Sequence, residues 1–372
     1  MDSLMKSTKM KINAILAGVI AASLSFQAQA GYTGFLSKDL HRPMTLQTAG
    51  DSDVMLASCQ CEAGNATAGC DLAEPMQFGG CDSTPCCDSI SSCDSLGCDT
   101  KSLFGHGWIK PSEGCYDDFI SPMTNPVYFE DPRQLTEARA IFINHKLPSL
   151  AGLPADAIRL YALQVRLRLT ERLSLIAVKD GYIDSSHPLI ENGWADIGAG
   201  LKYSLYRNPN AGRLLSAGAR FETTAGRRRS LQGNGDGVFD FFLSGGARLG
   251  SRAHYMTTSG FILPVDTQAE NQMFYWSNHL DRRIGNKLYA FSELNWYNYM
   301  KNASAFPLPV EGGDLFNLGS PGVRGNNLVT NAWGLKVKPN RNIESGIAFE
   351  FPLTERRGVL DNRLTADLIV RF

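Results

Sequence analysis

The last ten residues of the chain, Arg363-Leu-Thr-Ala-Asp-Leu-Ile-Val-Arg-Phe372, alternate between polar and apolar side chains. The apolar set is Leu364, Ala366, Leu368, Val370 and Phe372, the polar set is Arg363, Thr365, Asp367 and Arg371, and Ile369 is the exception. A period of two places these sets on opposite faces of a β-strand. The stretch therefore predicts a strand with one apolar face and one charged face, and an edge strand of a soluble protein could show the same pattern.

This ending resembles the last strand of bacterial outer-membrane β-barrels, in which a terminal aromatic residue is part of the assembly signal. The resemblance implies that Phe372 is this signal and that the barrel-assembly machinery binds the last strand. It also implies contact with outer-membrane lipid. If Phe372 faces lipid, Asp367 and Arg371 face the barrel interior.

The amino terminus has the pattern of a secretory signal peptide. Lys6, Lys9 and Lys11 precede an apolar stretch at residues 14–26, and Ala28-Gln29-Ala30 follows as a small-residue cleavage site. The apolar stretch is shorter than the roughly 20 residues that a membrane-spanning helix needs. We therefore expect residues 1–30 to be removed on export to the outer membrane. The net charge of −1 implies no nucleic-acid partner.

All nine cysteines lie in one segment, and many are followed by aspartate. They are Cys59, Cys61, Cys70, Cys81, Cys86, Cys87, Cys93, Cys98 and Cys115. Few large apolar residues accompany them, so residues 31–118 are expected to be a largely irregular periplasmic segment held by disulfides. Metal binding is the alternative, but the cysteine spacings match no zinc pattern and histidine is scarce nearby. We expect no metal and no other cofactor.

Residues 119–134 form a lead-in whose prolines, Pro122, Pro126 and Pro132, oppose regular structure. Together with the Cys-Asp segment, the lead-in resembles the start of an uncharacterised family of bacterial proteins with outer-membrane barrels. The resemblance covers residues 119–372. It implies location and architecture but no known activity.

From residue 135 onward, strand signals about ten residues long repeat with turn signals between them, which is the length that crosses a bilayer at a tilt. The predicted strands are 136–146, 157–169, 172–181, 194–206, 213–224, 237–249, 253–264, 271–281, 287–299, 326–337, 342–352 and 363–372. Twelve is an even number, as is usual in single-chain bacterial barrels. Residues 135–372 are therefore predicted to form an all-β, transmembrane up-and-down antiparallel barrel.

The connections between these strands support a barrel over a sandwich. Short connections, such as 170–172 and 250–252, take turns with mostly longer ones, such as 182–193 and 300–325. An up-and-down barrel with periplasmic turns and outer loops predicts this rhythm, whereas the crossovers of a Greek-key sandwich fall irregularly.

Charged residues on the inward parity carry both signs. The candidate lumen-lining residues are Arg166, Arg168, Asp196, Lys202, Arg220, Glu222, Asp240, Arg248, Glu293, Glu344, Glu350, Asp367 and Arg371. Twelve strands lie between the filled eight-stranded barrels and the open sixteen-stranded ones. Inward glycine and serine residues leave space, which favours a narrow channel or transporter for small solutes. The alternative is a non-conducting structural or surface-anchoring protein with a disulfide-linked Cys-rich segment.

Three further features receive less specific interpretations. Loop 300–325 is expected to be exposed rather than folded into the mouth, and Arg227-Arg228-Arg229 is expected to be solvated. Ser277 and His279, or His254 with nearby serines, could support nucleophilic catalysis. The chain has no Gly-x-Ser-x-Gly motif, so we assign no catalytic residues and expect no enzyme.

Overall fold

The structure, a computed structural model, describes residues 107–149, 154–188 and 190–372. Its strands are β1 (Glu137–Leu147), β2 (Asp156–Arg168), β3 (Leu173–Lys179), β4 (Tyr182–Ser185), β5 (Gly193–Trp194), β6 (Gly198–Asn208), β7 (Arg213–Glu222), β8 (Val238–Leu249), β9 (Ala253–Pro264), β10 (Gln272–Arg283), β11 (Leu288–Lys301), β12 (Asn327–Asn340), β13 (Ile343–Pro352) and β14 (Asn362–Arg371). A 3-10 turn, η1 (Arg228–Ser230), lies between β7 and β8. The predicted signal peptide and every candidate disulfide cysteine except Cys115 lie outside the described residues.

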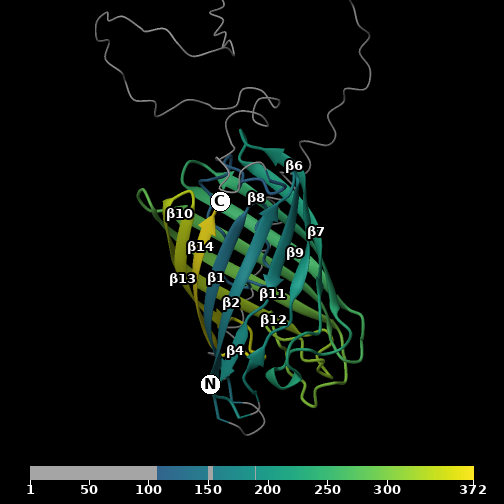
Figure 1. The fold of residues 1–372 in the computed structure, drawn as a ribbon. Helices are drawn as coiled ribbons and strands as arrows, with labels where there is room; N and C mark the ends of the chain where they lie inside the picture. The colour runs from purple at the N-terminus through teal and green to yellow at the C-terminus, as the bar shows by residue number, and fades with distance from the viewer. Residues whose placement is uncertain (1–106, 150–153, 189) are drawn as a thin grey trace, which may run out of the picture. The chain divides into compact units, whose positions relative to one another are not determined.

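The strands close into an antiparallel barrel (Figure 1). From β7 to β13 each strand pairs with its sequence neighbours, β1 pairs with β2, and β14 closes the cylinder by pairing with β1 from Glu137↔Arg371 to Lys146↔Asn362. β3 and β4 both pair with β2 and form one barrel strand, and β5 and β6 continue each other in the same way. The predicted closed twelve-stranded barrel is therefore confirmed.

The prediction that 182–193 is a plain loop was wrong. β4 occupies its start, and the Tyr182↔Trp194 and Ile183↔Gly193 pairs join β4 to β5. An irregular step at Asp180-Gly181, where Gly181 has φ +140°, separates β3 from β4. This step breaks the polar–apolar alternation of the strand. The sequence pattern therefore gave no sign that the barrel strand continues from β3 into β4.

The barrel has its apolar side chains outside and its charges inside. Trp194, Trp333, Leu163 and Ile197 are more than half exposed on the outer face, whereas buried charged residues line the interior. Water-facing surfaces rarely carry so continuous an apolar band, which is typical of a wall that faces hydrocarbon. Among the described residues, no helix is long and apolar enough to span a membrane.

Inward glycines on three strands lie under aromatic rings of the neighbouring strand. Phe291 pairs in register with Gly334, and a Cβ added to Gly334 would lie 2.2 Å from its ring. Phe242 covers Gly218 and Tyr275 covers Gly260 in the same way. These pairs hold the rings flat against the wall and leave the centre of the barrel free for other residues.

We expect Gly334→Val to destabilise the barrel, because the new side chain would push Phe291 inward against Ile120 and Met123, which pack on it. Overpacking of this kind costs about 1–3 kcal/mol. The urea midpoint of the folded, heat-modifiable band measures the effect. Gly245→Val is the matched control, because the nearest atoms to a Cβ there lie at ordinary contact distances of 3.5 and 3.6 Å and its φ is not positive. Equal losses in the two variants would contradict the proposed packing role.

Candidate functional site

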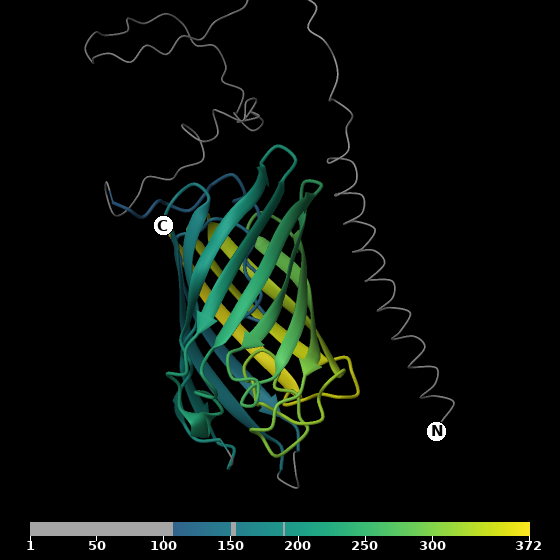
Figure 2. The ribbon, with the colours of Figure 1, turned by 90° about the vertical axis from the view of Figure 1, so that its right-hand side faces the viewer.

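The interior of the barrel is occupied by the chain that precedes β1, which we call the lumen segment and define as residues 111–136 (Figure 2). Its backbone is irregular, and every residue from Phe119 to Glu137 is buried. Phe119, Ile120, Met123 and Glu130 are fully enclosed, with 0 % exposure. The segment therefore fills the cross-section of the barrel where it passes.

Carboxylates of the wall hold the backbone of the lumen segment. Glu293 accepts hydrogen bonds from the N–H of Met123 at 2.7 Å and of Thr124 at 2.6 Å. Glu344 accepts one from the N–H of Ser121 at 2.8 Å. Hydrogen bonds from backbone groups to charged partners are stronger than neutral ones, so these two carboxylates are the main anchors of the segment on this side of the barrel.

Wall hydroxyls and ammonium groups bind the carbonyl groups of the same segment. Ser244 and Thr258 donate to the carbonyl oxygen of Glu130 at 2.6 and 2.9 Å, and Ser216 donates to that of Pro132 at 2.7 Å. Lys338 donates to the carbonyl of Phe119 at 2.8 Å. Side chains from strands on several sides of the barrel thus provide hydrogen-bond partners for the backbone of the lumen segment, which has no secondary structure of its own.

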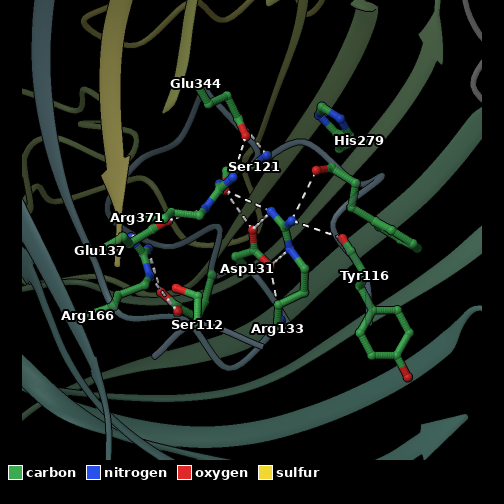
Figure 3. A network of polar contacts seen from close by, with 12 residues as sticks. Ser112, Tyr116, Ser121, Asp131, Arg133, Glu137, Arg166, His279, Glu344 and Arg371 are labelled. Carbon is green, nitrogen blue, oxygen red and sulfur yellow. Dashed lines mark hydrogen bonds and ion pairs between the residues drawn. The ribbon is translucent and has the colours of Figure 1, made fainter. Parts of the chain in front are cut away.

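A continuous set of buried ion pairs runs along the inner wall (Figure 3). Arg371 bridges Glu137 and Glu344, each at 2.8 Å. Lys336 joins Glu344 at 2.7 Å to Asp367 at 3.0 Å. These side chains are between 0 and 2 % exposed, so each charge depends on its partners for compensation.

The lumen segment supplies charges to the same set. Glu130 accepts from Arg166 at 2.9 Å and from Lys202 at 2.8 Å. Within the segment, Arg133 pairs with Asp131 at 2.7 Å and donates to the carbonyl of Phe119 at 3.0 Å (Figure 3). These contacts hold the segment both to the wall and in its own folded shape.

Two histidines lie in a row of carboxylates inside the barrel. His254 contacts Asp118 at 3.0 Å and Asp281 at 2.8 Å, and His279 contacts Asp281 at 3.3 Å and Glu293 at 2.6 Å. Each ring nitrogen faces a carboxylate oxygen, which fits doubly protonated rings. The row connects Asp118 of the lumen segment to Glu293, one of the two main anchors of that segment.

The residues considered for catalysis lie within this packed interior. His279 is 0 % exposed, and Ser277 accepts a hydrogen bond from Asn125 of the lumen segment at 2.8 Å. The nucleophile and base of a hydrolase need to contact a substrate in a cleft. The described residues provide no such cleft at Ser277, and its neighbours are all structural partners.

Loop 302–326 folds into one mouth of the barrel, so the expectation that it is exposed was wrong. Leu315, Phe316 and Leu318 are 2 to 5 % exposed and belong to an apolar cluster with Val127 of the lumen segment. Asp314 pairs with Arg363 of the wall at 2.8 Å. Because the loop is rich in glycine and proline, its sequence does not distinguish a packed loop from an exposed one.

All but two of the predicted lumen-lining residues are buried. Glu222 and Arg248 are partly buried, and Asp196 lies before β6, where it caps the N–H groups of Gly226 and Gly233. The buried set is Arg166, Arg168, Asp196, Lys202, Arg220, Asp240, Glu293, Glu344, Glu350, Asp367 and Arg371. Ser216 and Ser244 contact the lumen segment and Gly218 lies under an aromatic ring, and the lumen segment fills the space expected for a pore. Three interior cavities measure only about 30, 20 and 10 Å³.

Sequence reasoning missed several interior charges. Arg363 lies on the same parity as Asp367 and Arg371, so the opening pattern already marked it as inward. Lys336 and Lys338 could have been found by the same parity along β12. Glu130 and Asp131 gave no signal, because nothing in a proline-rich charged stretch indicates burial.

The outer loops contain two local ion pairs at the arginine run. Arg227 and Arg229 are more than half exposed and pair with Glu191 at 2.6 and 2.8 Å. Two of the three arginines are therefore paired with one carboxylate, and Arg228 donates to the carbonyl of Gly233 at 3.2 Å, so the run is exposed but not simply solvated.

Glu270, in the loop between β9 and β10, is a buried carboxyl whose Oε2 lacks a hydrogen-bond partner. Burial, followed by repulsion from Glu222, raises its pKa to about 8. Between pH 4.5 and 8 the unfolded chain loses this proton but the folded one does not, so stability should fall as pH rises through that window.

We expect Glu270→Gln to flatten the fall in the urea midpoint from pH 5 to pH 9. Asp184→Asn, on an exposed carboxylate, should leave the slope unchanged, and a slope unchanged in Glu270→Gln would contradict the assignment.

No protein-family model matches the chain. No curated protein shows significant sequence similarity to it. Among solved structures, an outer-membrane channel from Pseudomonas putida F1 has a TM-score of 0.50 at 11% identity and covers 68% of this chain and 100% of its own. The NanC porin has a TM-score of 0.41 at 8% identity, covering 64% of this chain and 98% of its own. At these identities the similarity shows the fold alone.

Proposed function

We propose that the protein is an outer-membrane channel for small polar solutes and that the lumen segment is its gate. The exposed apolar band supports placement in a membrane, and the predicted signal peptide and terminal Phe372 support export to the outer membrane. The polar, mixed-charge inner wall supports solutes that are polar and without strong preference for one sign of charge.

The observation that carries the proposal is the kind of contact that holds the lumen segment. Charged and hydroxyl side chains such as Glu293 and Ser244 bind its backbone, and its apolar side chains are divided among three separate clusters instead of forming one core of their own. Water can replace hydrogen bonds of this kind when the segment moves, whereas it cannot replace a hydrophobic core. The closed state is therefore compatible with an open state of the same barrel.

The alternative is a structural or surface-anchoring protein that never conducts. The complete burial of residues 119–137 favours it, since a permanently filled barrel needs no gate. The two functions differ in whether the lumen segment ever leaves its anchors.

Planar-bilayer recordings of the purified, folded protein distinguish the two functions. A gated channel should show brief, discrete conductance steps, and variants that weaken the anchors should show more of them. If such variants remain silent while their heat-modifiable band shows a folded barrel, the channel proposal is wrong and the structural alternative stands.

A further inference from the structure

The barrel wall is interrupted where β3 ends and β4 begins. β2 pairs with β3 over Val165–Arg168 and with β4 over Ile158–Tyr161, and the Asp180-Gly181 step lies between these two ladders. The side chain of Gln164 donates to the carbonyl of Val178 at 2.6 Å, in the gap between the ladders. Gly181 is required here, because a Cβ would lie 2.6 Å from the carbonyl oxygen of Tyr161.

A groove of about 910 Å³ runs over the outer face of the barrel at this interruption and extends across β1 to β14 and β13. Small residues such as Ala140, Ala162 and Ala366 line it, and the exposed side chains of Leu163 and Trp194 lie along it. A wall that faces lipid leaves such a groove to be filled by a hydrocarbon chain.

The groove also contains a carboxylate. Asp180 lines it and accepts a hydrogen bond from the N–H of Leu163, while its Oδ1 is buried without a partner. The Tyr182–Trp194 pair, with ring centroids 5.4 Å apart, lies two residues further along the strand toward the outer loops. With the Tyr182–Trp194 pair at the membrane interface, Asp180 would lie on the hydrocarbon side of it, where a partly buried acid is costly and usually functional.

We propose that this groove is a binding site for a single-chain amphiphile from the lipid phase whose head group donates hydrogen bonds. The chain lies over Ala140 and Ala366, and a hydroxyl or ammonium head binds the carboxylate of Asp180, which lines the groove. Where Asp180 is ionised, a carboxylate-headed chain binds less well than an alcohol or amine, because the two negative charges repel each other. The site rests on the membrane placement proposed above and does not depend on conduction.

Photolabelling of the full-length protein in vesicles tests the site. A diazirine-tailed long-chain alcohol should label peptides around residues 161–163 and 194–197 saturably, and a long-chain amine or alcohol should compete. A fatty acid of equal length should not compete. Asp180→Ala should weaken competition by about tenfold or more, the effect of losing a hydrogen bond to a charged group.

Two alanine variants separate binding from folding. Ala366→Leu fills the groove and should abolish saturable labelling. Ala219→Leu adds the same bulk to an exposed position of β7 outside the groove and should leave it intact. Even labelling of all lipid-exposed positions around the barrel would overturn the proposal. Competition by the fatty acid that is as strong as competition by the alcohol would overturn it as well. Photolabelling measures binding and not current. A negative result in the bilayer recordings can therefore be told apart from a negative result in the labelling experiment.

Discussion

Replacing Glu293 by glutamine should open the barrel in planar bilayers. The carboxylate accepts hydrogen bonds from the N–H groups of both Met123 and Thr124 and contacts His279, and an amide cannot accept on both sides. Losing one charged hydrogen bond costs about 1.5–3 kcal/mol, which corresponds to roughly a tenfold to hundredfold higher ratio of open to closed states. Single-channel open probability measures this ratio directly.

Glu350→Gln is the matched control for that experiment. Glu350 is equally buried on the neighbouring part of the wall, where it pairs with Arg363 at 2.6 Å, but its hydrogen bonds go to wall residues and not to the lumen segment. It should lower stability without raising open probability. If both variants conduct alike, loosening of the barrel rather than release of the lumen segment explains the current.

The barrel was predictable because its wall obeys a simple rule. Side chains alternate between lipid and interior along each strand, so parity alone assigned Lys202, Asp240 and Arg371 to the inside. The rule failed where the backbone departs from the period of two. At Asp180-Gly181 the extra step made β4 look like part of a loop.

The content of the lumen was not predictable from local sequence. Glu130, Asp131 and Arg133 in a proline-rich stretch look like exposed loop residues, since burying such charges is expensive without partners. The partners of Glu130 are Arg166 and Lys202, which lie 36 and 72 residues further along the chain. Only the closed barrel brings these charges together, so no local pattern could have shown that the segment is buried.

Replacing Arg371 by methionine should strongly reduce the amount of folded barrel. Arg371 lies on β14, beside the seam with β1, and its guanidinium satisfies Glu137, Glu344 and the hydroxyl of Ser121. Removing it leaves two buried carboxylates short of a partner, a loss that typically costs about 3–5 kcal/mol. The folded fraction on heat-modifiability gels and the urea midpoint should both fall.

A second substitution distinguishes charge compensation from simple loss of packing at the seam. Adding Glu137→Gln to Arg371→Met removes one of the two carboxylates that Arg371→Met leaves short of a partner. It should recover part of the lost stability, because a buried charge without its partner destabilises the fold more than the absence of both charges does. Arg159→Met breaks the exposed Arg159–Asp184 pair and should change the midpoint little. If the double variant is no more stable than Arg371→Met, the loss arises from the volume and shape of Arg371, and the buried ion pairs contribute no compensation at the seam.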